Sequence, residues 1–319
     1  MQLVSVATNP VPSGAVTGSF AGHDGAPLRF ARWEATRGPR RGTVCLFPGR
    51  GEYIEKYFEV VSELRRRGFA VATLDWRGQG GSYRELPDPS RGHVSSFQSY
   101  DRDLLRFMKD VVLPDCPPPY VALAHSMGGN IILRHAIEPQ SWFDRLILCA
   151  PMIAIAPERL RAPVWAAQLY AEVLGAVGLG GRFVRGGAGA PIELDPFEGN
   201  LLTSDRERHE RNAAVLRAVP VLGLGSPTVG WLRAALRSCA TIGASDYPQG
   251  VTVPALLFAA GNDEIVSTAA IERFAVGLKV GTHIMMPGAR HEILQETDAV
   301  RRRFWAAFDA YLGIDRAAA

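Results

Sequence analysis

The stretch Leu123-Ala124-His125-Ser126-Met127-Gly128-Gly129 places a serine among small residues. An apolar run precedes this stretch, and the apolar spacing of a buried helix follows it. The context is typical of a nucleophile elbow, a sharp turn between a strand and a helix that lifts a serine hydroxyl clear of the sheet. Such a turn needs small residues two positions before and two after the serine. Here they are Ala124, one methyl group larger than the usual glycine, and Gly128. Ser126 is therefore the predicted nucleophile.

A serine hydroxyl becomes an effective nucleophile beside a general base, which an acidic side chain must orient. In chains with this type of elbow the acid comes next in the sequence and the histidine last. The apolar run 254–260 predicts a buried strand that ends in a turn with Asp263, and the run 283–286 leads into a loop with His291. Because the carboxyl ends of parallel strands meet at one edge of a sheet, we expect Ser126, Asp263 and His291 to form a catalytic triad.

Other carboxylates and histidines are alternatives, but their positions fit less well. Glu264 lies one residue farther along the turn, and Asp246 precedes the strand. His125 is next to the serine, where its side chain is expected to point away from the tip of the elbow. The remaining histidines considered lie before or outside the expected loop: His93, His135 and His209.

The negative charge that develops during acyl transfer needs preorganised backbone donors. One predicted donor is the N–H of Met127, at the start of a helix whose dipole favours a negative charge. The other should come from the loop after the apolar run that ends at residue 47, which begins Pro48-Gly49-Arg50. Proline has no N–H, which leaves Gly49 or Arg50, and Arg50 is the better candidate by position.

Apolar strands alternate with helices along most of the chain, which predicts an α/β fold with a mostly parallel central sheet covered by helices on both faces. The predicted strands lie at about residues 15–20, 28–33, 43–48, 70–75, 120–125, 145–150, 254–260 and 281–286. The predicted helices lie at about residues 55–67, 97–112, 127–138, 268–278 and 297–312. The gap before the seventh strand is too long for a loop. Residues 151–247 are therefore predicted to form an inserted, mainly helical lid on a core of residues 1–150 and 248–319.

Within the predicted lid, apolar residues recur at helical spacing and predict a helix with an apolar face: Val164, Trp165, Leu169, Val173 and Val177. This face could pack on the other helices of the lid, on an acyl chain or on a bilayer surface. The glycine-dense stretch 175–189 lacks the G-x-G-x-x-G spacing of a phosphate-binding loop, so it is predicted to be a mobile connector.

Three arginines, Arg206, Arg208 and Arg211, follow a polar segment that can cap a helix through Ser204 or Thr203. One interpretation is a solvated helix face. The other is a phosphate-binding rim that contacts the substrate, because the guanidinium group matches the geometry of a phosphate.

Composition restricts the function classes. The 319 residues are 47% hydrophobic, enough to bury a full core, and the net charge of +3 does not call for nucleic acid. No stretch reaches the roughly 18 apolar residues of a membrane span, and the amino-terminal residues lack the pattern of a secretory signal, so we expect a cytoplasmic protein. The four cysteines show no metal-ligand spacing and are expected to be reduced packing residues: Cys45, Cys116, Cys149 and Cys239.

Five motifs occur together between about Gly42 and Leu312: Pro48-Gly49-Arg50, Asp75-Trp76-Arg77-Gly78-Gln79-Gly80, Arg91-Gly92-His93-Val94, Ala124-His125-Ser126-Met127-Gly128-Gly129 and Gly288-Ala289-Arg290-His291-Glu292. As a set they resemble the bacterial lysophospholipases of the monoacylglycerol-lipase-like branch of the α/β-hydrolases. Pro48 departs from the His-Gly-x loop usual in that branch, but the bacterial lysophospholipases most similar to this chain carry Pro-Gly-Arg. The resemblance implies the same triad, with the N–H groups of Arg50 and Met127 as the oxyanion hole.

The residues lead us to expect a serine hydrolase that cleaves a carboxylic ester through an acyl-enzyme, with no metal or organic cofactor. The resemblance adds a single-chain amphipathic lipid, a lysophospholipid, as substrate, and a peripheral contact with the inner membrane through the lid is a further expectation. A monoacylglycerol lipase or general carboxylesterase is the alternative, and a peptidase or acyltransferase could use the same triad. An alternative of another class is a non-catalytic hydrolase-like binding protein, although such a protein should have lost a triad member.

Overall fold

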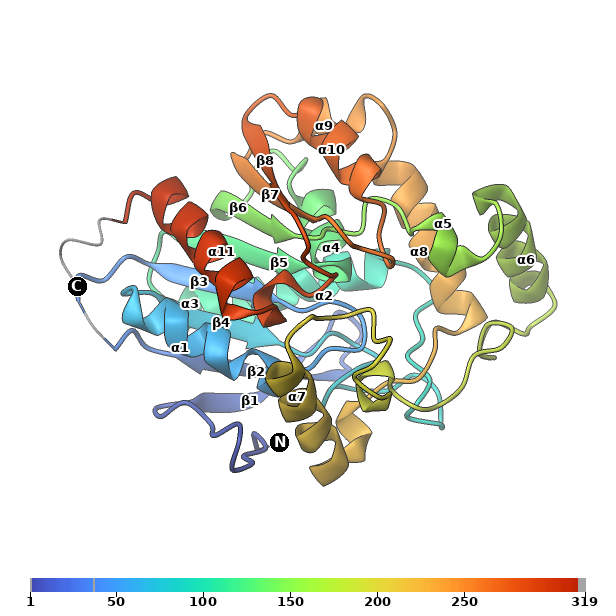
Figure 1. The fold of residues 1–319 in the computed structure, drawn as a ribbon, viewed down its shortest axis with the longest axis horizontal. Helices are drawn as coiled ribbons and strands as arrows, with labels where there is room; N and C mark the ends of the chain where they lie inside the picture. Colours follow the sequence, from blue (N-terminus) through green and yellow to red (C-terminus); the bar gives the residue numbers. More distant parts are fainter. Residues whose placement is uncertain (1, 37, 315–319) are drawn as a thin grey trace.

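The computed structural model describes residues 2–36 and 38–314, and within them one sheet contains eight strands (Figure 1). Their order across the sheet is β1-β2-β4-β3-β5-β6-β7-β8. The β1–β2 and β2–β4 pairs are antiparallel, and the other neighbours are parallel. The bounds are β1 (Val16–Ala21), β2 (Pro27–Trp33), β3 (Thr43–Phe47), β4 (Ala70–Leu74), β5 (Tyr120–His125), β6 (Phe143–Cys149), β7 (Ala255–Ala260) and β8 (Gly281–Met286). The predicted mostly parallel sheet is confirmed.

Helices cover both faces of this sheet. Every residue of β3, β5 and β7 is buried, which requires apolar cover above and below these strands. Figure 1 shows α1 and α11 in front of the sheet and α2 and α4 behind it. The core helices are α1 (Phe58–Arg66), α2 (Gln98–Phe107), α3 (Leu113–Asp115), α4 (Met127–His135), α10 (Thr268–Val276) and α11 (Asp298–Tyr311). The helix expected over residues 97–112 changes after α2 into a π-helical turn, Met108–Val112.

Residues 151–247 connect β6 to β7 through helices and loops and add no strand to the sheet. Their helices are α5 (Pro157–Leu160), α6 (Val164–Ala176), α7 (Arg206–Ala218), α8 (Val229–Ile242) and α9 (Tyr247–Gly250, which runs past the insertion), with short 3-10 turns at Ile192–Leu194 and Pro220–Leu222. Figure 1 shows α6 at the outer edge of the molecule, whereas α7 lies near the amino-terminal strands.

A small apolar cluster fastens α7 to the core. Tyr53 packs against Val215, Leu216 and Leu222, and its hydroxyl donates to the Asn212 carbonyl oxygen at 3.0 Å. This cluster is separate from the main core, which lies between the sheet and its covering helices.

The prediction that Ser204 or Thr203 caps α7 is wrong. The cap is Asp205, whose carboxylate accepts from the Arg208 N–H at 2.9 Å. The Thr203 hydroxyl instead donates to the Gln295 carbonyl oxygen, and the Ser204 hydroxyl donates to the Glu296 carboxylate. Both hydroxyl groups that were expected to cap α7 therefore bond to residues 92 positions farther along the chain.

Candidate active site

Ser126 occupies a tight turn between β5 and α4, with φ of 50° and ψ of −113°. A positive φ is a strained backbone conformation for a residue other than glycine, and it persists only where surrounding contacts hold it. The Ser126 N–H donates to the Cys149 carbonyl oxygen at 3.0 Å, and the Ser126 carbonyl oxygen accepts from Asn130 and Met152. The ends of two neighbouring strands and the first turn of α4 thus hold the elbow.

The structure gives a specific reason for the glycine at position 128. A Cβ atom there would lie 2.5 Å from the Phe47 carbonyl oxygen and 2.7 Å from that of Pro48. Backbone atoms cannot move aside as the end of a side chain can. The neighbouring strand β3 and the loop after it therefore require the small residue that the sequence interpretation attributed to the elbow itself.

The structure brings Ser126, His291 and Asp263 together in a chain of hydrogen bonds. The distance from Ser126 Oγ to His291 Nε2 is 3.0 Å, and that from His291 Nδ1 to Asp263 Oδ2 is 2.8 Å. All three residues lie at the carboxyl ends of parallel strands, because β5, β7 and β8 lead directly into their loops. With a proton on Nδ1 bonded to Asp263, the neutral imidazole has Nε2 free to accept the proton of the serine hydroxyl.

The second carboxylate oxygen of Asp263 is also satisfied. It accepts from the N–H groups of Ile265 at 2.8 Å and Val266 at 3.0 Å. Burial opposes ionisation of this carboxyl group, but His291 and the two N–H groups outweigh that effect and lower its pKa. Asp263 is therefore held as an anion, in the orientation that fixes the His291 ring.

Two backbone N–H groups predicted to hold the oxyanion, those of Arg50 and Met127, have no hydrogen-bond acceptor among the described residues. Gly49 lies against the serine, since a Cβ atom at that glycine would be 3.1 Å from the Ser126 Cβ. The Gly49 N–H already donates to the Glu52 carboxylate. Within the described residues the N–H groups of Arg50 and Met127 donate no hydrogen bond, and a first-turn N–H such as that of Met127 has no partner inside its helix. Of the two loop candidates, Arg50 is the one with a donor available.

A buried network of charged side chains contacts the His291 loop and was not predicted from the sequence. Glu52 accepts from the Tyr57 hydroxyl at 2.6 Å and from His125 Nδ1 at 3.1 Å, and His125 Nε2 faces the His291 carbonyl oxygen at 3.1 Å. Since both ring nitrogens face acceptors, the imidazolium form of His125 satisfies both. Burial alone would lower the pKa of His125, but Glu52 outweighs it and raises that pKa.

Lys56 extends the network to the insertion. Its ammonium group lies 2.5 Å from Glu292, 3.3 Å from Glu52 and 3.4 Å from Glu193. Glu292 follows His291 in the chain, whereas Glu193 belongs to residues 151–247. One buried cation thus joins the segment after β3, the loop after β8 and the insertion.

The arginines predicted to contact substrate form ion pairs with carboxylates of the protein. Arg208 and Arg211 both pair with Glu59 of α1, at 2.7 and 2.8 Å, and Arg206 pairs with Glu198. Burial opposes ionisation of Glu59, but the neighbouring arginines lower its pKa to about 2. Within the described residues no hydrogen bond or ion pair joins these arginines to the triad. Arg208 and Arg211 connect α7 to α1, and Arg208 also pairs with Asp298 of α11 at 2.7 Å.

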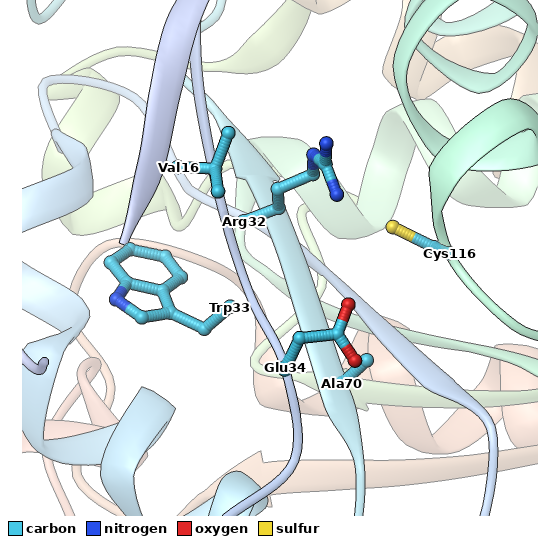
Figure 2. Close-up of a pocket in the computed structure, with 6 residues that line it drawn as sticks. All are labelled: Val16, Arg32, Trp33, Glu34, Ala70 and Cys116. Carbon is cyan, nitrogen blue, oxygen red and sulfur yellow. The ribbon is translucent and has the colours of Figure 1, made fainter. Parts of the chain in front are cut away.

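Two cavities among the described residues lie away from the triad. One of about 20 Å³ lies among Val16, Arg32, Trp33, Glu34, Ala70 and Cys116, as Figure 2 shows. Ala70 begins β4, so this cavity lies at the amino ends of the parallel strands, and it has room for about one water molecule. The other, of about 350 Å³, lies between segments 86–91 and 178–182. Neither is lined by Ser126, Asp263 or His291.

The remaining expectations concern cysteines, metals and membrane spans. All four cysteines are buried and unpaired, as expected of packing residues. Across residues 2–36 and 38–314, no group of three or more His, Cys, Asp or Glu side chains is arranged to hold a metal ion. In the same ranges no helix is both long and apolar enough to cross a bilayer.

Comparison with known proteins identifies the family. The model of the family described as serine aminopeptidase, S33, matches residues 38–298. Lysophospholipase L2 of Escherichia coli K12 is 35% identical over 294 residues, which cover 88% of this chain and 83% of that protein. The monoacylglycerol lipase of Mycolicibacterium smegmatis is 28% identical and covers 88% of this chain and 91% of that protein.

Solved structures agree on the fold. A soluble variant of monoglyceride lipase from Saccharomyces cerevisiae superposes with a TM-score of 0.74 at 22% identity, covering 97% of this chain and 98% of that one. The monoacylglycerol lipase of Paleococcus ferrophilus gives a TM-score of 0.69 at 22% identity, covering 90% and 99%. The predicted family and enzyme class, a carboxylic ester hydrolase, are confirmed. The chain belongs to the S33 family, in the lysophospholipase- and monoacylglycerol-lipase-like branch of the α/β-hydrolases.

Proposed function

We propose that this chain hydrolyses the carboxylic ester of a lysophospholipid, with Ser126, His291 and Asp263 as the catalytic triad. The observation that carries the proposal is the hydrogen-bonded series from Ser126 Oγ through His291 to Asp263, at 3.0 and 2.8 Å. The Ser126–His291 distance allows the imidazole to take the proton of the serine hydroxyl, and the His291–Asp263 distance allows the carboxylate to orient the ring.

In this mechanism His291 Nε2 takes the hydroxyl proton as Ser126 Oγ attacks the ester carbonyl carbon. The N–H groups of Arg50 and Met127 stabilise the oxyanion of the tetrahedral intermediate. His291 then gives its proton to the departing glycerol oxygen, which leaves an acyl-enzyme. Water attacks the acyl-enzyme with His291 as base, and the fatty acid and free serine are released. Asp263 stabilises the imidazolium throughout. Every step uses a group of this chain, so the mechanism requires no metal or organic cofactor.

The choice of a lysophospholipid follows the relatives named lysophospholipase L2, at 35% identity across most of the chain. The second candidate is a monoacylglycerol, favoured by the relatives with that name. Both substrates are single-chain esters of glycerol, and they differ in the phosphate head group.

Residues 151–247 are proposed to act as a lid on a core of residues 1–150 and 248–319. In support, Arg50 beside the elbow donates to the Gly225 carbonyl oxygen of this insertion at 2.9 Å, and Lys56 reaches its Glu193. The insertion is thus fastened to the loops around the serine. A lid in this position would shield the acyl-enzyme from solvent.

The exposed face of α6 is proposed to rest on the surface of a lipid bilayer, the inner membrane. Large apolar side chains four residues apart on this helix are mostly solvent-exposed, Trp165 (68%), Leu169 (58%) and Val173 (52%), and Val177 (64%) continues the series just past its end. The opposite face packs through the small residues Ala167 and Ala171, which are buried. Exposed arginines lie beyond both ends of the helix, at positions 159, 161, 182 and 185, and suit an anionic lipid surface.

A hydrolysis panel tests the proposed function. Lysophospholipids, monoacylglycerols, short p-nitrophenyl esters and aminoacyl amides are compared by kcat/KM, and lysophospholipids are expected to rank first. A higher rank for monoacylglycerols would favour the second candidate. Labelling of Ser126 by a fluorophosphonate probe is expected in the same preparation, and its absence in folded protein would favour a non-catalytic binding protein.

A further inference from the structure

The guanidinium group of Arg50 lies beside the elbow without a carboxylate partner. Its Nη2 donates to the Gly225 carbonyl oxygen at 2.9 Å, and its Cζ lies 5.0 Å from the centre of the Trp231 ring. Its Nε is buried and donates to nothing in the described part of the chain. The residue as a whole is still partly exposed, so a ligand could reach it.

Two other buried cations, Arg29 and Lys56, are neutralised by carboxylates. Arg29 pairs with Glu55 at 2.7 Å and with Asp75 at 2.6 Å. Lys56 lies against three glutamates, as described above. Removing a charge from water costs several kcal/mol unless a partner compensates it. Among the described residues no ion pair includes Arg50, so its charge lacks the direct carboxylate contact that Arg29 and Lys56 have.

The electrostatics of Arg50 favour an added anion. Burial lowers the pKa of its guanidinium group to about 10, which leaves it charged at neutral pH. The positive charge of Arg159 acts in the same direction as burial, whereas Tyr100 and Glu193 partly offset both. Arg159 lies in α5, soon after the carboxyl end of β6, and it too has no ion pair within the described ranges. A negative group near Arg50 would relieve both the desolvation and the repulsion.

The position of Arg50 relates this charge to the reaction. Its backbone N–H is the proposed oxyanion donor, and its side chain extends from the same residue toward the insertion. The number of covalent bonds from the backbone nitrogen of arginine to its Cζ equals the number from the carbonyl carbon of a 1-acyl lysophospholipid to its phosphorus. One residue can therefore contact both ends of that glycerol unit.

We propose that the Arg50 side chain, with Arg159 nearby, binds the phosphate of the substrate head group while the Arg50 N–H binds the ester oxyanion. This inference rests on the proposed function and names the group that selects a phosphorylated glycerol ester over a neutral one. The chemistry recognised is a phosphate ester on glycerol, and a guanidinium can donate to two of its oxygens at once.

Arg84 provides a matched control. Its Nη2 also donates to a carbonyl oxygen of the insertion, that of Val221 at 2.8 Å, and it has no carboxylate partner within ion-pair distance in the described residues. Burial likewise lowers its pKa to about 10. Arg84 differs from Arg50 in that it does not belong to the loop beside Ser126. A role limited to fastening the insertion should therefore make the two arginines behave alike.

The first experiment compares Arg50→Met, Arg159→Met and Arg84→Met with the wild type. The substrates are a short-chain lysophosphatidylglycerol and the monoacylglycerol with the same acyl chain, both below their critical micelle concentrations. We expect Arg50→Met to lower the ratio of the two kcat/KM values at least tenfold, Arg159→Met to lower it less, and Arg84→Met to leave the ratio within twofold. Arg50→Lys should recover part of the ratio because it retains the charge. A ratio that Arg50→Met and Arg159→Met leave unchanged would overturn the proposal.

The second experiment measures binding without turnover, so it separates this inference from the proposed function. The full chain with Ser126→Ala is titrated with sn-glycerol 3-phosphate and with glycerol by calorimetry, with and without Arg50→Met. We expect the phosphate ester to bind more tightly than glycerol, and this preference to disappear with Arg50→Met. If the wild type fails to hydrolyse lysophospholipids while the preference is present, the substrate assignment fails and the phosphate subsite stands. Equal binding of sn-glycerol 3-phosphate with and without Arg50→Met would remove the subsite.

Discussion

The loops around Ser126 and the helices of residues 151–247 use charge and apolar surface in opposite ways. Around the serine, charged groups are buried and each has a partner of opposite charge, as in the network of Glu52, His125 and Lys56. In the insertion, α6 exposes large apolar side chains, and the arginines of α7 form ion pairs near the surface. The contrast fits the proposed roles, in which the loops around Ser126 carry out the chemistry and the insertion contacts the substrate and the membrane.

The largest effect is expected from the triad. Ser126→Ala or His291→Ala should lower kcat by several orders of magnitude without unfolding the protein, because triad members act as a unit. Asp263→Asn should be nearly as damaging, since it loses the charge that fixes the His291 tautomer. Steady-state kinetics with circular dichroism as a folding control measure this. A variant that keeps more than about a tenth of the wild-type rate, less than roughly 1.4 kcal/mol of barrier, would place its residue outside the mechanism.

A smaller but still large effect is expected at Gly128. Gly128→Ala places a methyl group 2.5 Å from the Phe47 carbonyl oxygen, so we expect a loss of about 1–3 kcal/mol in the free energy of unfolding, together with reduced activity. Ala124→Gly is the matched control in the same elbow and should cost less, about 1 kcal/mol, through backbone entropy and the loss of one buried methyl group. Urea denaturation compares the two. Equal stability of Gly128→Ala and wild type would contradict the close packing of the elbow against β3.

The proposed contact between α6 and a bilayer can be tested separately from the chemistry of the core. Trp165→Glu combined with Leu169→Glu should lower co-sedimentation with anionic phosphatidylglycerol vesicles about tenfold or more, because both side chains are mostly exposed and apolar. Activity on a monomeric short-chain ester should be nearly unchanged, since the triad does not contact α6. Vesicle binding that survives the double substitution would mean that α6 is not the contact surface.

The buried pair of His125 and Glu52 predicts a pH-dependent stability. The pKa of His125 is raised in the folded state, so its contribution is fully present below its unfolded pKa, about 6.5, and is lost as pH rises through the folded value. The pKa of Glu52 is lowered, so its contribution is present above about 4.3 and is lost in acid. The wild type should therefore exceed His125→Gln in stability by more at pH 6 than at pH 9. Urea midpoints at the two pH values check this, and a difference that grows toward pH 9 would have the wrong sign.

The smallest effect is expected from the arginines of α7. If Arg206, Arg208 and Arg211 bound phosphate, replacing each with glutamine would raise KM for lysophospholipids and leave monoacylglycerols unaffected. Because Arg208 and Arg211 already pair with Glu59, we expect changes of less than about threefold that are equal for both substrates. A selective rise in KM that weakens with added salt would instead restore the phosphate-binding interpretation.

The sequence by itself determined the architecture and the order of the candidate triad. The patterns that predicted them are local: small residues around Ser126, two apolar runs followed by the loops with Asp263 and His291, and alternating strands and helices. Such patterns can be recognised in a sequence because they reflect local backbone preferences. The eight strands lie close to their expected positions for the same reason.

Only the tertiary structure decided which groups meet across long stretches of chain. Lys56 and Glu292 are 236 residues apart in sequence, and the residue pattern around each of them does not predict their contact. The free N–H of Arg50, the surroundings of its guanidinium group, the exposed face of α6 and the cap at Asp205 likewise depend on neighbours from other elements. Burial and pairing of charges arise when distant segments pack, so a one-dimensional pattern of residue types identifies the candidate catalytic residues but not the side chains that position them.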